Sequence, residues 1–425
     1  MIKSKNIVCV FANAKYWTDN VELDKAYLQI CNELSGIFDS FKLITTEEEA
    51  AMLEGGQTLI AIPMSGAVQP AMIVAASKFS SVIIYPSYIE NNFSKDLCDK
   101  MLAYNAAPAV MDTYAVLKRE DRPVKFSLNK DELVSTLRVI NAYNAVKGAK
   151  LLLIGDVEPW VISPTRNLEK YENQLGVRFE KLGLEVMKSY YEAVSDAELD
   201  AFMNARKDLD KKRIEPTCED IVRASRFAVA FEKLLRDKGA DGAAIACFKL
   251  LSELNTTACL ALGHINSDTE LIAACEGDVD SAVTMLMIKK ITDKSVWMAN
   301  PNLLSDGSIN FVHCTAPSTV AGVACDTVLR NHHESGIGVS PEVTFPEGLN
   351  LTVCRYSIEE SAMFIHRGKG FAGLNQNSCR TQYRVVLDDF SEYIKNTLGC
   401  HAVFAFEDVK DELDMLAELL KIKVV

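Results

Sequence analysis

The sequence predicts an α/β protein in which two doubly wound parallel-sheet domains precede a mainly antiparallel β domain. Two series of continuous apolar runs, rich in β-branched residues, alternate with helical patterns, and the second series starts near residue 149. Strands of this kind separated by helices are typical of parallel sheets covered on both faces. After Thr292 the pattern changes to short strands with turn signals. We therefore predict domains at 1–148, 149–292 and 293–425.

The first domain contains four predicted strands and a closing helix at about 130–146. The first three strands are followed by polar or turn residues, at the edge where parallel sheets bind ligands. The strands are expected at 6–12, 58–64, 81–86 and 108–112.

The second domain begins with a strand at 149–156, and the loop after it carries Trp160. Further strands are expected at 183–190, 242–248 and 257–263. No glycine-rich dinucleotide loop or P-loop follows any of these strands, which argues against enzymes of either class.

The third domain is predicted from alternating segments and from the Asp306-Gly307 pair, which is a strong hairpin signal. An amphipathic helix at 409–422 ends it, with leucines on one side. Its strands are expected at 295–300, 308–314, 348–357, 361–368, 381–387 and 401–406.

Composition narrows the classes of partner. The chain has 425 residues and a formal net charge of -13 without a basic patch, so we expect no nucleic-acid partner. No apolar run approaches the roughly 20 residues of a membrane helix, and no leader is recognised at the start, so we expect no membrane partner and a cytoplasmic location. Most of the 12 cysteines sit in apolar segments and none forms a CxxC pair, which is typical of reduced, buried thiols.

The segment 273–287 places Glu276 and Asp278 at the start of an apolar helix, with Gly277 between them. One interpretation is structural: Asp278 caps the helix and the acids complement its dipole. The other interpretation is functional: the two carboxylates belong to a catalytic or binding site. The residue pattern alone leaves both open.

All six histidines lie in the last two fifths of the chain. His401 starts a predicted strand after the Gly399-Cys400 turn, and His313 lies at the end of another. Functional residues often lie at the ends of strands. A divalent ion prefers oxygen ligands and can also bind an imidazole.

From about residue 240 onward the chain resembles the L-fucose isomerase and L-arabinose isomerase-like sugar isomerases. The resemblance is carried by ordered blocks, of which ACEGD at 274–278 and GCHAVFAF at 399–406 are two. The other blocks are CLALGHINSDTELIA at 259–273, VWMANPNLLSDGSINFVHCTAP at 296–317, HHESGIGV at 332–339 and CRTQ at 379–382.

The resemblance implies a divalent metal cofactor, Mn²⁺, held by Glu276, Asn300 and His401. At Asn300 the chain departs from the family, where an Asp is expected. An amide oxygen can bind an ion, but it brings no charge and cannot take a proton. The resemblance also implies a homotrimer or homohexamer.

The implied activity is a metal-dependent interconversion of aldoses and ketoses through an ene-diol, on an open-chain carbohydrate. The ion would stabilise charge on the sugar oxygens while a carboxylate moves the proton. Glu276 and Asp278 are the predicted catalytic residues. The alternatives are a sugar-binding or regulatory relative that has lost turnover, which Asn300 favours, and a metal-assisted sugar lyase.

Four further residues are predicted to bind the substrate, each with a structural alternative. His313 and Asn302 lie beside the Asn300 strand and could bond sugar hydroxyls, or form a turn. Arg380 could pair with an acidic group of the substrate or of the fold. Trp160 could stack on a sugar ring or fill a buried space.

Overall fold

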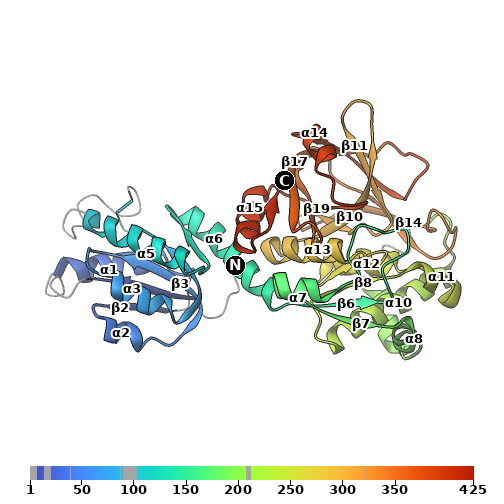
Figure 1. Cartoon of the computed structure of the whole chain (residues 1–425). Coiled ribbons are helices and arrows are strands. Elements are labelled where there is room, and N and C mark those ends of the chain that lie inside the picture. Colours follow the sequence, from blue (N-terminus) through green and yellow to red (C-terminus); the bar gives the residue numbers. More distant parts are fainter. Residues whose placement is uncertain are drawn as a thin grey trace. The chain divides into compact units, whose positions relative to one another are not determined.

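The structure is a computed structural model that describes residues 7–13, 21–38, 40–86, 88–89, 103–206, 212–320 and 322–425. The chain divides into two compact units, residues 1–144 and 145–425 (Figure 1). No helix in these described ranges is both long and apolar enough to cross a membrane.

The first unit contains a five-stranded parallel sheet in the order β2-β1-β3-β4-β5. The predicted strands at 6–12, 58–64 and 81–86 are confirmed as β1, β3 and β4, and the closing helix as α6. The elements are β1 (Ile7–Ala12), α1 (Val21–Glu33), β2 (Ser40–Ile44), α2 (Glu47–Ala51), β3 (Gly56–Pro63), α3 (Gln69–Ala76), β4 (Phe79–Ile84), the 3₁₀ helix η2 (Ala103–Ala106), α5 (Ala107–Arg119), β5 (Val124–Phe126) and α6 (Lys130–Lys147).

The strand predicted at 108–112 is wrong, because these residues form the first turns of α5. Pro108 occupies the start of this helix, where its missing N–H costs nothing. The fifth strand is β5 instead, and it has three residues. A run this short carries almost no periodicity for sequence reasoning to detect.

The second unit begins with a four-stranded parallel sheet in the order β7-β6-β8-β9. The strands predicted at 149–156 and 242–248 are confirmed as β6 and β8. The elements are β6 (Lys150–Ile154), α7 (Glu169–Leu175), β7 (Arg178–Leu182), α8 (Leu184–Glu192), α9 (Asp196–Asn204), α10 (Cys218–Asp237), β8 (Gly242–Ile245), α11 (Phe248–Leu254), α12 (Cys259–Asp268), β9 (Ile272–Ala274) and α13 (Val279–Thr292).

Two predicted strands of this sheet are wrong, because 183–190 forms most of α8 and 257–263 forms the start of α12. The first five residues of α12 are all buried, and a short buried helix has the same apolar run as a buried strand. The true strand β7 is polar and only partly buried, and β9 has three residues, so neither has a strong sequence signal.

The remainder of the second unit is a mainly antiparallel β region that closes into a barrel. The strand order is β16-β19-β10-β11-β18-β17, and β16 also pairs with β17. The predicted strands and the Asp306-Gly307 hairpin are confirmed. The elements are β10 (Val296–Leu303), β11 (Ile309–His313), β12 (Thr319–Val320), β13 (Val323–Ala324), β14 (Asp326–Arg330), β15 (Ser340–Thr344), β16 (Asn350–Ser357), β17 (Ala362–Ala372), β18 (Thr381–Leu387), α14 (Phe390–Lys395), β19 (Ala402–Ala405), α15 (Lys410–Leu419) and β20 (Lys423–Val424).

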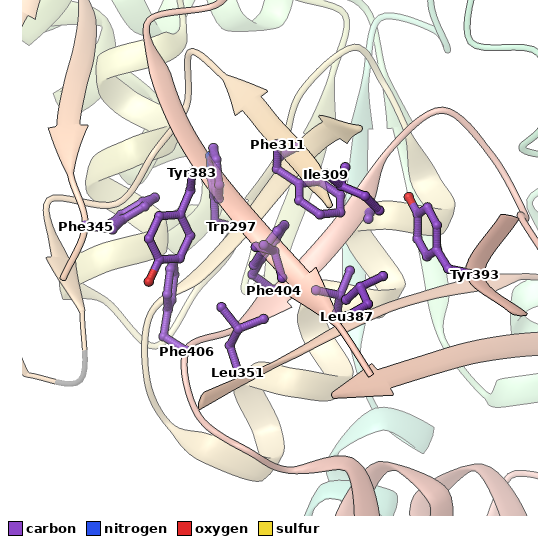
Figure 2. Packing of buried hydrophobic residues seen from close by; sticks show 14 of the residues in the cluster. Trp297, Ile309, Phe311, Phe345, Leu351, Tyr383, Leu387, Tyr393, Phe404 and Phe406 are labelled. Carbon is purple, nitrogen blue, oxygen red and sulfur yellow. The ribbon is translucent and has the colours of Figure 1, made fainter. Parts of the chain in front are cut away.

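Aromatic side chains from different strands fill this barrel (Figure 2). The ring of Phe404 lies 5.1 Å from Trp297 and 4.8 Å from Phe311 between centroids. Aromatic pairs at these distances stabilise a core beyond the area that they bury. The barrel is therefore packed solid, and a binding site has to lie at its rim.

Helix α13 joins the parallel sheet to the barrel. It contacts β8 and β9 on one side and β10, β16 and β19 on the other. Since both sheets contact this helix, its side chains are covered on all sides, and twelve of its residues are buried. Its first turn therefore lies where the two sheets meet.

Candidate functional site

The candidate site lies where strand ends of the parallel sheet meet one rim of the barrel. Glu276 follows β9 and Trp160 lies in the loop after β6. From the barrel, Asn300 lies in β10, His313 ends β11 and His401 immediately precedes β19. The pairing of Asn300 with Val312 and of Ala299 with Ala402 brings these three barrel residues to the same edge.

A tight turn presents Glu276 to the site. Glu276 and Gly277 have φ angles of 57° and 65°, in the left-handed region. The Glu158 N–H donates to the Glu276 carbonyl at 3.0 Å, and the Gly277 N–H donates to Ile245 at 2.9 Å. A non-glycine residue in this conformation is strained, so these bonds hold Glu276 in a costly but defined position.

Asp278 connects the start of α13 to His401. Its carboxylate accepts the Ser281 N–H at 3.0 Å, so the predicted capping role is confirmed. It also accepts a bond from Arg355 Nη1 at 2.9 Å and lies 2.8 Å from Nδ1 of His401. Arg355 further donates to the His401 carbonyl at 3.1 Å. Asp278 and Arg355 are fully buried, so this ion pair fixes the imidazole ring.

Glu276 and two histidines converge at the rim. Oε1 of Glu276 lies 3.5 Å from Nε2 of His401 and 3.8 Å from Nε2 of His313. Both Nε2 atoms are buried without a hydrogen-bond partner among the described residues. On the far side of each ring, Nδ1 is held by Asp278 or, for His313, by the Thr315 hydroxyl at 3.0 Å.

The electrostatics of this group favour positive charge. Burial by itself would raise the pKa of Glu276, but His313 and His401 outweigh it and hold the pKa well below its usual range. Burial would lower the pKa of His401, but its interactions with Asp278, Cys400 and the nearby Glu276 carboxylate raise it well above its ordinary value. An environment that stabilises the protonated imidazole in this way also favours a bound cation.

These three residues fit a divalent ion. The two histidines and the carboxylate each offer one donor atom, and the donors lie within 4.8 Å of one another. Donors bound to one ion at about 2.1 Å lie about 3 to 4 Å apart, close to the separations from Oε1 of Glu276. Imidazole and carboxylate donors suit first-row divalent ions. Two buried, unpartnered ring nitrogens beside an ionised carboxylate are what such an ion would satisfy.

A pocket of about 480 Å³ opens beside these groups. Trp160 and Phe248 meet edge to face at 4.9 Å between centroids and form an apolar wall. The Trp160 indole N–H donates to Oε2 of Glu276 at 2.7 Å. The volume is typical of small-molecule sites. The pocket is lined by Trp160, Phe248, Glu276, Asn300, Glu334, Cys400 and His401.

The structure gathers most of the predicted site residues here. Glu276, Asn300, His401 and Trp160 all line the pocket. His313, which was predicted to bind substrate, belongs with the possible metal ligands instead. The Glu276-His401 proximity, on which the sequence argument depended, is observed at 3.5 Å.

Three predicted residues do not face the pocket. Asp278 is buried behind His401, and this placement contradicts direct proton transfer to a substrate. Asn302 donates to Gln376 at 3.2 Å, and Arg380 donates to the Asn331 carbonyl at 2.8 Å. Neither is among the residues that line the pocket. Both side chains bond to other parts of the fold, but Asn302 lies in β10 and not in a turn, and the Arg380 bond goes to a backbone carbonyl and not to an acid.

Sequence reasoning missed Arg355, Phe248 and Glu158. Arg355 lies inside an apolar strand, and a cation there is a sign that it has a buried acidic partner. Glu158 is buried, and its carboxylate accepts the Phe248 N–H at 3.2 Å. Burial raises the pKa of Glu158. Phe248 has no signal of its own, because nothing in its sequence neighbourhood indicates contact with Trp160.

No protein-family model matches this chain, and a search of curated proteins gives no match either. The chemistry of the site therefore has to be argued from its own geometry.

Proposed function

We propose that this protein is a metal-dependent aldose-ketose isomerase that acts on an open-chain sugar. The observation that carries the proposal is the convergence of Glu276 with the unpartnered Nε2 atoms of His313 and His401 beside an open pocket. The resemblance of the ordered blocks around these residues to the sugar isomerases agrees with it.

In this proposal Glu276, His313 and His401 hold the divalent ion, and Asn300 adds a neutral oxygen at the pocket wall. The resemblance indicates Mn²⁺ as the ion. Such an ion, when bound, would stabilise negative charge on neighbouring oxygens of a sugar. Asp278 is a positioning residue here, because it keeps Nδ1 of His401 engaged and leaves Nε2 toward the pocket.

The pocket itself suits a carbohydrate. The Trp160-Phe248 wall offers an apolar surface for C–H groups, and Glu334 and Asn300 offer acceptors for hydroxyl groups. Trp160 also ties the wall to Glu276 through its indole N–H. A ligand that packs on this wall would therefore lie beside the possible metal ligands.

The test is hydrogen exchange at C2 of a sugar. Purified protein with Mn²⁺ is incubated in D₂O with a panel of aldoses and ketoses, including sugars with acidic substituents, and deuterium uptake and isomer formation are measured. We expect the wild type to exchange and Glu276→Gln to lose at least about 10-fold in rate, because the variant removes a carboxylate proposed to hold the ion. We expect calorimetry to show weaker Mn²⁺ binding by the same variant.

The matched control is Glu360→Gln, since Glu360 is exposed in the turn after β16 and has no side-chain bond to any described residue. It should retain wild-type rates and Mn²⁺ affinity. Absence of exchange in the wild type would contradict the isomerase, and absence of Mn²⁺ binding would contradict the metal site.

A second candidate function is sugar binding without turnover, and the amide at Asn300 favours it. In that case the wild type would bind Mn²⁺ and sugar but exchange no deuterium, and Asn300→Asp would gain exchange. A lyase would instead be revealed by cleaved products in the same reactions.

A further inference from the structure

We propose that Glu334 is the carboxylate that carries the proton in this site, in place of an acid at position 300. This assignment rests on the isomerase proposed above. It makes Glu334 a catalytic residue on a loop of the barrel region, outside the metal-binding group.

The other acidic candidates are already engaged or out of reach. Oε1 of Glu276 faces the two histidines and Oε2 accepts the Trp160 N–H, so neither oxygen is left for a substrate proton. Asp278 is fully buried in its ion pair with Arg355. An amide such as Asn300 cannot act as a base.

Glu158 is excluded by its position. It is 3% exposed, its carboxylate accepts the Phe248 N–H, and it is not among the residues that line the pocket. Glu276 and Glu334 are therefore the two carboxylates of the lining. Glu334 is exposed, and no described residue forms a hydrogen bond or ion pair with its side chain. Its carboxylate is available to a ligand.

A tight turn holds Glu334 at the pocket. The Gly336 N–H donates to the His332 carbonyl at 2.9 Å, and the His332 N–H donates to Ile337 at 3.1 Å. The His332 ring contacts the Ser335 hydroxyl at 3.0 Å. These bonds close the loop on both sides of Glu334, so that it is presented from a defined turn.

Three neighbours, Arg380, Phe248 and Thr257, contact this turn. Arg380 donates to the Asn331 carbonyl at 2.8 Å, and the His332 ring meets Phe248 edge to face at 5.8 Å. Gly338 has a φ of 66° and approaches Thr257 so closely that a Cβ would lie 2.6 Å from its side chain. Arg380 therefore serves the site indirectly, by holding the turn that carries Glu334.

The proposed step moves two protons, one from C2 to C1 and one from O2 to O1, and consumes no other reactant. Glu334 takes the proton from C2, and the C2–H electron pair forms the C1=C2 bond. The π pair of the C1 carbonyl moves to O1, which receives the proton that O2 releases. The proton on the exposed Glu334 carboxyl exchanges with solvent, Glu334 delivers a proton or deuteron to C1, the C1=C2 pair forms the new C1–H bond, and a lone pair of O2 forms the C2 carbonyl.

The experiment compares Glu334→Gln with wild type in the same D₂O assay and measures Mn²⁺ affinity separately by calorimetry. We expect the exchange rate to fall at least about 100-fold, the usual contribution of general acid-base catalysis, while Mn²⁺ affinity stays within about threefold. Glu334→Asp, which keeps the carboxylate, should recover part of the rate. Asn300→Asp in the Glu334→Gln background should also recover exchange, because it restores a carboxylate to the pocket.

The outcomes separate the two proposals. If the wild type exchanges deuterium and Glu334→Gln does so within about threefold, the role of Glu334 is overturned while the isomerase stands. If Glu334→Gln instead lowers Mn²⁺ affinity more than about tenfold, Glu334 is a ligand and the assignment is again overturned. If the wild type exchanges nothing, both proposals fall. Glu360→Gln remains the control and should match the wild type throughout.

Discussion

Gly277 is the residue at which the site tolerates a side chain least. Its φ of 65° already favours glycine, and a Cβ at this position would lie 2.3 Å from the carbonyl oxygen of Asp156. That oxygen belongs to backbone in the loop after β6, so it cannot swing away. The two loops approach each other closely at Gly277, and this places Glu276 beside Trp160. The geometry of the site therefore depends on the absence of a Cβ atom at position 277.

Gly277→Ala should therefore destabilise the protein by about 3 kcal/mol, combining left-handed strain with overpacking. Gly307→Ala is the matched control, since Gly307 has a φ of 80° but no atom within 4 Å of the place that a Cβ would occupy. It should cost only about 1 kcal/mol. Urea unfolding measures both, and equal losses would show that the Asp156 contact has no energetic weight.

At the scale of the element, α13 organises the interior of the second unit. Asp278 caps it, and Asp280 in its first turn is also buried, with its carboxylate accepting the Tyr171 hydroxyl at 2.5 Å and the Ile358 N–H at 3.2 Å. The other oxygen of Asp280 has no partner among the described residues. Burial is the main cause that raises the pKa of Asp280 to about 7, with Asp278 adding to it.

This pKa predicts a pH dependence with a definite sign. The folded protein binds a proton at Asp280 up to about pH 7, whereas the unfolded chain releases it near pH 4, so stability falls as pH rises between these values. Asp280→Asn removes that titration. The unfolding free energy of wild type minus that of the variant should fall by a few kcal/mol, on the order of 1.4 per pKa unit, from pH 4 to 7. Parallel curves for the two proteins in urea titrations would contradict it.

At the scale of the molecule, the two units have separate interiors. The first unit has a core of its own around β1, β3 and β4, and the second contains the aromatic core of the barrel. All residues of the candidate site belong to the second unit. A ligand of the site should therefore stabilise one unit and leave the other unchanged.

Calorimetric unfolding should show two transitions, of which Mn²⁺ raises only one. At a free concentration about 100 times its Kd, the ion should stabilise that transition by about 2.7 kcal/mol. Leu59→Ala, which opens a cavity at a fully buried position of β3, should lower only the other transition. A single transition moved by both changes would show that the units unfold together.

The sequence by itself determined the α/β character of the first part, the antiparallel strands after Thr292 and the capped helix after Asp278. These features have local causes, namely continuous apolar runs, alternation with hairpin signals, and a capping carboxylate. The failed strands at 108–112 and 257–263 were apolar runs whose length suits a strand or a buried helix equally, whereas 183–190 mixes polar and apolar residues and forms a helix in which Met187 is the buried residue. The strands that were missed in the two parallel sheets, β2, β5, β7 and β9, have three to five residues each, and β7 is also polar, so they show weakly in the pattern.

For the site, local patterns at the ends of predicted strands pointed to Glu276, His401 and Trp160, and the resemblance to the sugar isomerases added Asn300. Only the tertiary structure decided which of them meet. Pairing of β10 with β11 and β19 brings Asn300, His313 and His401 to one edge, so that His313 lies with the possible metal ligands, and the buried Arg355 withdraws Asp278 from the pocket. Contacts between residues far apart in the chain depend on packing and register, and no local pattern records them.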